Sequence, residues 1–193
     1  MGYDIPLNNV GDTLYIRAKD KNDDCAGIKI TGTGKFACSG NIMSLLDASC
    51  QQDYVPLPDQ TLYPGYGCFG GNGGSGPVLF DPSLHLVSAP KLPATVLSYR
   101  CYKWLFTEQS DLSAAPELPA TTLAKNCYES MFCNCTSLTA APDLPATQLA
   151  DHCYACMFEG CTQFTECHMK ESMNGVYDPS VHGDTDKTVV YDL

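Results

Sequence analysis

Apolar and small residues in the second half of the chain recur with a period of 26 residues. Three segments, which begin at Leu86, Leu112 and Leu138, share the pattern L-x3-P-x-L-P-A-T-x-L-x3-C-Y-x3-F without an insertion. A fixed period of this length is typical of repeat proteins, in which each unit buries its apolar face only by stacking on its neighbours. The sequence therefore predicts an array of similar units rather than one globular core.

Each unit is expected to contain a short strand followed by a helix. In the first unit the strand covers residues 86–89 and ends before Pro90, which has no backbone donor for a ladder bond. Thr95 is suited to cap a helix, and apolar residues then recur every four positions up to Phe106, as one helix face of about three turns requires. A strand and a helix in 26 residues predict an α/β fold, a right-handed leucine-rich-repeat solenoid of about three repeats.

The ends of the array diverge, as terminal repeats do. Leu79 and Phe80 stand one period before their counterparts in the first unit, whereas after Phe164 the pattern stops. Alternation at 14–17, 27–31 and 35–38 predicts strands, and so does the apolar run at 187–191. The expected organisation is an N-terminal β cap at 1–64, a glycine-rich connector at 65–78, leucine-rich repeats at 79–167 and a C-terminal tail at 168–193.

Composition excludes several classes of partner. The formal net charge of -11 disfavours nucleic acid and anionic lipid, because both are bound mainly through lysine and arginine. No apolar run approaches the ~20 residues of a membrane span, so none is predicted. The first residues do not resemble a secretion leader. The chain is therefore expected to be cytoplasmic, carried in a particle, or a mature product whose leader is not shown.

Cysteines occupy fixed positions of the repeat. Cys101, Cys127 and Cys153 form one row, and Cys135 and Cys161 form another. Neighbours in a row lie about 4.8 Å apart on stacked units, within the range of a disulfide, but their side chains point in parallel. We favour buried free thiols that pack as small apolar groups, with disulfides as the alternative.

A zinc site is a second interpretation of the third unit. Zinc-binding residue types cluster there, namely His152, Cys153, Cys156, Cys161, Cys167 and His168. The repeat accounts for every one of these cysteines except Cys156. We therefore predict neither a metal nor another cofactor.

No catalytic pattern is convincing. Residues 65–70 fit G-x-G-x-x-G without the flanking strand and helix that dinucleotide binding needs. Residues 20–24 resemble a calcium loop, but Cys25 replaces the glycine and Thr31 the glutamate. A cysteine nucleophile with His85, His152 or His182 would need convergence in space without any local signature. The chain is therefore not expected to be an enzyme.

Other positions of the repeat vary in charge and size while the apolar positions stay constant. Repeat proteins bind partners through such variable outer positions, although they are equally consistent with simple exposure to water. Tryptophan, tyrosine and arginine are enriched in binding hot spots. The candidate partner-binding residues are Tyr99, Arg100, Trp104, Lys125, Glu129 and Asp151.

The run LTAAPDLPATQLADHCYACMFEGCTQF at 138–164 resembles the BspA-like leucine-rich repeats of Bacteroides-type bacteria, and residues 112–163 match best. The resemblance implies a non-catalytic adhesive protein, on the cell surface or secreted, with a protein or glycan ligand. Related sequences also occur in phages of these bacteria. The alternative is therefore a structural or decoration (host-attachment) protein of a virion, whose partners are its neighbours in the particle.

Overall fold

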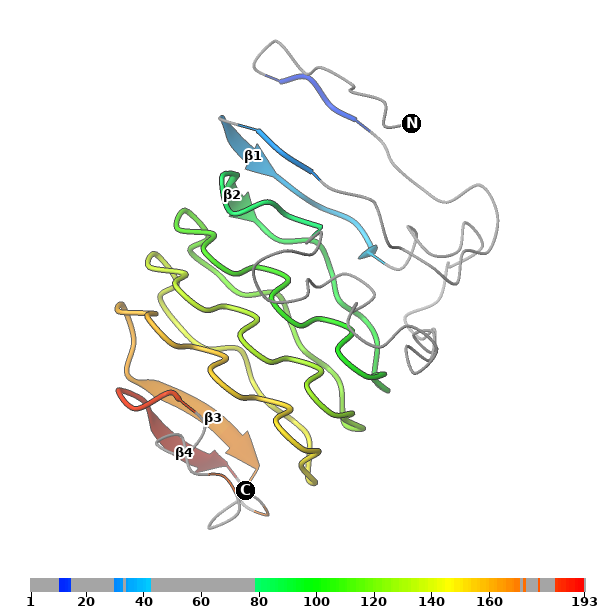
Figure 1. The fold of residues 1–193 in the computed structure, drawn as a ribbon, viewed down its shortest axis with the longest axis vertical. Helices are drawn as coiled ribbons and strands as arrows, with labels where there is room; N and C mark the ends of the chain where they lie inside the picture. Colours follow the sequence, from blue (N-terminus) through cyan, green and yellow to red (C-terminus); the bar gives the residue numbers. More distant parts are fainter. Residues whose placement is uncertain are drawn as a thin grey trace.

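The computed structural model describes residues 11–14, 30–32, 34–42, 79–170, 172, 177 and 183–192. Its strands are β1 (Lys35–Ala37), β2 (His85–Ser88), β3 (Glu166–Lys170) and β4 (Thr188–Asp192). β1 pairs in parallel with β2, and β3 with β4. Between these two small sheets the chain winds through coils that stack on one another (Figure 1). No helix in the described part of the chain is long and apolar enough to cross a membrane.

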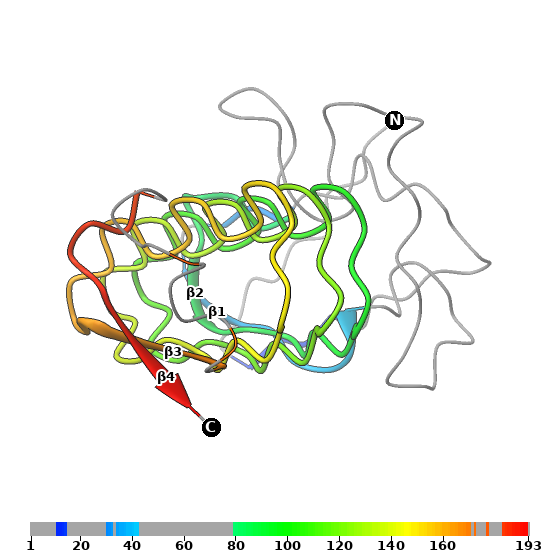
Figure 2. The ribbon, with the colours of Figure 1, turned by 90° about the horizontal axis from the view of Figure 1, so that it is seen from below.

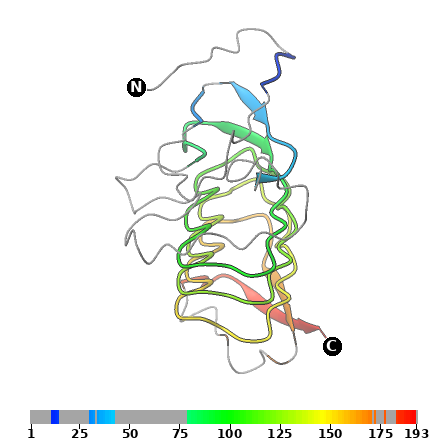
Figure 3. The same cartoon turned by 90° about the vertical axis from the view of Figure 1, so that its right-hand side faces the viewer.

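The sequence period corresponds to one coil of the stack. We name residues 86–111, 112–137 and 138–163 the first, second and third coil; Figure 3 shows them from the side. Ring centroids in a phenylalanine row lie 5.5 to 5.9 Å apart, and those in a tyrosine row 5.8 Å apart. All members of both rows are at most 1% exposed. The phenylalanine row consists of Phe80, Phe106, Phe132 and Phe158, and the tyrosine row of Tyr102, Tyr128 and Tyr154. Each buried ring contributes roughly 1.5–3 kcal/mol to stability.

The helices expected after Thr95 and its equivalents are not present in the described residues. Residues 99–108, 125–134 and 151–160 are runs of consecutive turns, which we name the turn runs. In the first run, every fourth residue has a left-handed backbone: Arg100, Trp104 and Glu108 have φ of 56°, 60° and 62°. Turns of four residues place apolar side chains at the same four-residue spacing as a helix does. The spacing alone therefore misled the prediction.

Backbone hydrogen bonds in a turn run alternate between two directions. The N–H of Cys101 donates within its own coil, to Ser98 at 3.4 Å, whereas the N–H of Tyr102 donates to Cys127 of the next coil at 2.9 Å. The second coil repeats this scheme, with Tyr128 donating to Cys153 at 2.9 Å. An α-helix would satisfy these donors internally, so the turn runs connect the coils where helices would not.

The four strands lie on the opposite side of the stack from the turn runs (Figure 2). β2 lies where a strand was expected, and β1 and β4 correspond to those expected at 35–38 and 187–191. The segments 112–115 and 138–141 are not strands; in both, alanine, which has low β-propensity, replaces Ser88 of β2. Thr139 nevertheless donates its N–H to Ser113 at 3.3 Å, so the coils stay in register.

Residues 30–42 cover the first coil. Ile30 pairs with Phe80 and Asn41 with Lys91 as isolated bridges on either side of the β1–β2 pair. The expectation that the 35–38 region closes the N-terminal end is consistent with these contacts. The expected strands at 14–17 and 27–31 lie largely outside the described residues, and the connector at 65–78 lies entirely outside them.

Polar side chains close the other end of the stack. Asp184 and Lys187 stand 26 residues after Phe158 and Cys161. Phe132 donates its N–H to the carbonyl of Met157 at 3.0 Å, but Phe158 donates to Oδ1 of Asp184 at 2.8 Å. Lys187 Nζ donates to the carbonyl of Cys161 at 2.7 Å. We name residues 183–192 the C-terminal cap; β3 crosses the expected boundary between 167 and 168 and pairs with it.

Candidate functional site

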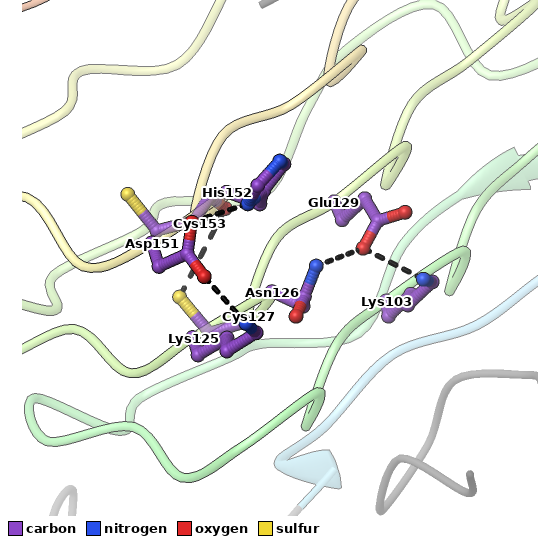
Figure 4. A network of polar contacts seen from close by, with 8 residues as sticks. All are labelled: Lys103, Lys125, Asn126, Cys127, Glu129, Asp151, His152 and Cys153. Carbon is purple, nitrogen blue, oxygen red and sulfur yellow. Dashed lines mark hydrogen bonds and ion pairs between the residues drawn. The ribbon is translucent and has the colours of Figure 1, made fainter.

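The six candidate residues all lie in the turn runs, whose outward side we name the turn face. Tyr99, Lys125 and Asp151 occupy one column across the three coils. Lys125 Nζ lies 2.5 Å from Asp151 Oδ2 (Figure 4), and the Arg100 guanidinium carbon lies 4.9 Å from the Tyr99 ring centroid. The stack thus brings together four of the residues that the variable positions indicated.

The other two candidates meet through Lys103, a variable position of the repeat that was not among the six candidates. Lys103 Nζ lies 2.6 Å from Glu129 Oε2 and 4.1 Å from the Trp104 ring centroid. Glu129 also accepts a hydrogen bond from the side-chain amide of Asn126 (Figure 4). Lys103 and Asn126 are only 6% and 7% exposed. Lys103 stands one period before Glu129, and Asn126 stands one period before His152. This spacing was the signal in the sequence that could have placed them on the turn face.

Charge on the turn face is paired between neighbouring coils. The hydrogen bond from Lys125 lowers the pKa of Asp151, and the same bond raises the pKa of Lys125. Both side chains are more than half exposed, so the pair is screened by salt and contributes little to stability. His152 also contacts Asp151. The exposed charges therefore remain available to a partner.

The backbone fixes where the turn-face side chains project. Arg100 and Trp104 adopt the left-handed conformation, which glycine or asparagine adopts more readily. Equivalent positions in the later coils hold Asn126, Ser130 and His152. Retaining large side chains at these positions costs backbone energy, and the turn geometry sets the direction in which the Trp104 and Arg100 side chains leave the backbone. Such preorganisation reduces the entropic cost of binding.

The cysteines of the described residues are free thiols. Those of the inner rows lie in the core, where Cys135 Sγ donates to the Phe106 carbonyl and Cys161 Sγ to the Phe132 carbonyl, both at 3.1 Å. Burial raises the pKa of Cys153, a member of one of these rows, to about 11. A protonated thiol is a poor nucleophile and a poor metal ligand, so these rows serve packing.

The described residues contain no group of three or more histidines, cysteines, aspartates or glutamates arranged to hold a metal ion. His152 instead contacts Asp151, and His168 Nδ1 lies 3.0 Å from Asp192. The glycine motif at 65–70, the acidic loop at 20–24 and His182 lie outside the described residues.

A second polar cluster, which sequence reasoning missed, lies on the strand side. Asp111 bonds two partners, His85 Nδ1 at 2.6 Å and Lys35 Nζ at 3.2 Å. The hydrogen bond with His85, and next that with Lys35, lowers the pKa of Asp111. Because Lys35 is outside the repeats, no period indicated this contact. The cluster ties β1 to the first coil.

Comparison with protein-family models, curated proteins and solved structures gives no match. The right-handed leucine-rich-repeat class and the resemblance to BspA-like repeats therefore stay predictions. The proposal about function is therefore based on the residues of the turn face.

Proposed function

We propose that this chain is a non-catalytic binding module of a bacterial surface or secreted adhesive protein. Its turn face would engage a protein or glycan partner. The resemblance of residues 112–163 to BspA-like repeats supports an adhesive role. The carrying observation is that interior columns repeat one residue type, whereas the column of Tyr99, Lys125 and Asp151 changes in size and charge.

The first coil offers the strongest anchors. Tyr99, Arg100 and Trp104 are half-buried, which leaves part of each side chain accessible while its position is set by packing. Interface energy is concentrated in a few residues of these types, and truncating one typically costs 2 kcal/mol or more, or about 30-fold in affinity. The flanking charges of Lys125 and Asp151 would orient the bound partner rather than increase its affinity.

The proposal is tested by applying the labelled full chain to arrays of glycans and of immobilised extracellular-matrix proteins. Trp104→Ala and Arg100→Ala probe the turn face, and Ser113→Ala on the strand side is the matched control. We expect the wild type to bind at least one array component. Each turn-face variant should weaken that binding by at least 10-fold, with Ser113→Ala unchanged. Thermal unfolding checks that each variant is folded.

The opposite pattern would count against the turn face: binding retained by Trp104→Ala and Arg100→Ala but lost in Ser113→Ala. Failure of the wild type to bind any component of either array would count against the adhesive role itself. Binding that all three folded variants retain would place the contact elsewhere on the chain.

A further inference from the structure

Asp184 places a carboxyl group where the repeat has a phenylalanine ring. It stands 26 residues after Phe158 and is 1% exposed. Its Oδ1 accepts the N–H of Phe158 at 2.8 Å, and its Oδ2 accepts the hydroxyl of Tyr177 at 3.2 Å. The side chain thus replaces the backbone carbonyl that a further coil would have supplied, and it joins the C-terminal cap to the third coil.

Both donors to this carboxyl are neutral, and Asp184 makes no ion pair with the described residues. The nearby cation is Lys187, but its Nζ is bonded to the Cys161 carbonyl at 2.7 Å and to Asp186 Oδ2 at 2.5 Å. Among the described residues, the other titratable groups that face Asp184 carry no positive charge: Cys133, Cys156, Cys161, Cys167, Tyr177 and Asp186. Burial among such groups disfavours the ionised carboxylate.

We infer that the C-terminal cap is a proton-dependent latch. In the protonated state Asp184 Oδ1 still accepts the Phe158 N–H, while the protonated oxygen donates to the Tyr177 hydroxyl, and residues 183–192 are held on the third coil; ionisation of this buried carboxyl loosens them. The latch is local, because the Phe132 N–H one coil earlier is bonded to the backbone carbonyl of Met157, which does not titrate.

The direction follows from proton binding. Burial raises the pKa of Asp184 from 3.8 to about 6, although the hydrogen bonds from Phe158 and Tyr177 and the charge of Lys187 oppose this shift. The closed cap therefore binds more protons than the open cap between these values. Its stabilisation is present below about pH 4 and is lost as the pH rises through about 6. A shift of about two pKa units makes opening about 100-fold more favourable at pH 7.5 than at pH 4.

Amide hydrogen exchange of the full chain, measured by NMR between pH 4 and 7.5, tests the latch. The exchange protection of the Phe158 amide is divided by that of the Phe132 amide, after correction for the intrinsic rate at each pH. We expect this ratio to fall by 10- to 100-fold between pH 4 and 7.5 in the wild type. In Asp184→Asn it should stay constant, because the amide oxygen still accepts the hydrogen bond and does not titrate.

Asp186→Asn is the matched control, since this carboxylate is 54% exposed and adjacent to the same lysine. It should retain the fall in the ratio. A ratio that is constant in the wild type would overturn the latch even if Asp184→Asn failed to fold. An equal fall in folded Asp184→Asn, or loss of the fall in Asp186→Asn alone, would overturn it as well.

Discussion

Ser130 distinguishes the turn runs from the helices that the apolar spacing predicted. It lies in the second coil with φ of 53°, in the left-handed region. Its backbone N–H donates to Ala155 at 2.8 Å, and its carbonyl accepts the Thr107 hydroxyl at 2.6 Å. Replacing Ser130 by glycine leaves both bonds and removes only the atoms that make this conformation unfavourable.

The expected gain combines two opposing contributions. The left-handed conformation costs a residue with a side chain roughly 1–2 kcal/mol. Glycine loses more backbone entropy on folding, which costs about 0.5–1 kcal/mol. Ser130→Gly should therefore stabilise the fold by about 0.5–1 kcal/mol, or about 1–4 °C in Tm for a chain of this size.

Ser137→Gly is the matched control. This serine lies in the same coil, is likewise half-buried and does not have a positive φ. Only the entropic cost then applies, so this variant should destabilise the fold by about 0.5–1 kcal/mol. Urea unfolding of both variants beside the wild type gives the two differences. Had residues 125–134 formed a helix, glycine at 130 would destabilise it by about 1 kcal/mol. That result would refute the turn-run geometry.

Three further predictions concern the interior and its ion pairs. Phe132→Ala should destabilise the stack by about 3–5 kcal/mol in urea unfolding, because it leaves a cavity in a fully buried row. Glu129→Gln should cost about 1–3 kcal/mol by the same measurement, since its lysine partner is buried, whereas the exposed Asp151→Asn should cost at most about 1 kcal/mol and lose its effect at high salt. At pH 8, iodoacetamide with mass spectrometry should label Cys156 slowly, because burial raises its pKa to about 11, and Cys127 only after unfolding. Rapid labelling of Cys127 in the native protein would contradict its placement in the core.

The repeat predicts which residues share a column, but not the local conformation between columns. Phenylalanine recurs at the same position of every unit, as Phe106, Phe132 and Phe158. Such recurrence indicates stacking, because equivalent positions of stacked units share the same buried environment. The left-handed residues at 100, 104 and 108 have no comparable signal in the sequence. Arginine, tryptophan and glutamate are poor indicators of this conformation, for which glycine or asparagine is typical. A helix was therefore the expected local solution.

The candidate site shows the same division. Variation at 99, 125 and 151 indicated an outward column, and Lys125 and Asp151 are more than half exposed. The contact of Lys103 with Glu129, in contrast, depends on side-chain direction within a turn run. A strand was expected at 187–191, but the role of Asp184 was missed because aspartate at a phenylalanine position looks like the end of the pattern. In the structure that aspartate occupies the same register and accepts the hydrogen bond that the next coil would have accepted.

Stability and recognition use different parts of each coil. The coils are joined by N–H and C=O groups, as between Trp104 and Glu129 at 3.0 Å, and by the buried rings. Every residue except proline supplies the backbone groups, so an outward side chain of a turn run can change without breaking the ladder. The two ends of the stack cannot vary in this way, because the backbone N–H and C=O groups of a terminal coil have no neighbouring coil on one side and need other hydrogen-bond partners. This difference explains why the turn face varies between coils, while 30–42 and the C-terminal cap depart from the repeat in order to close it.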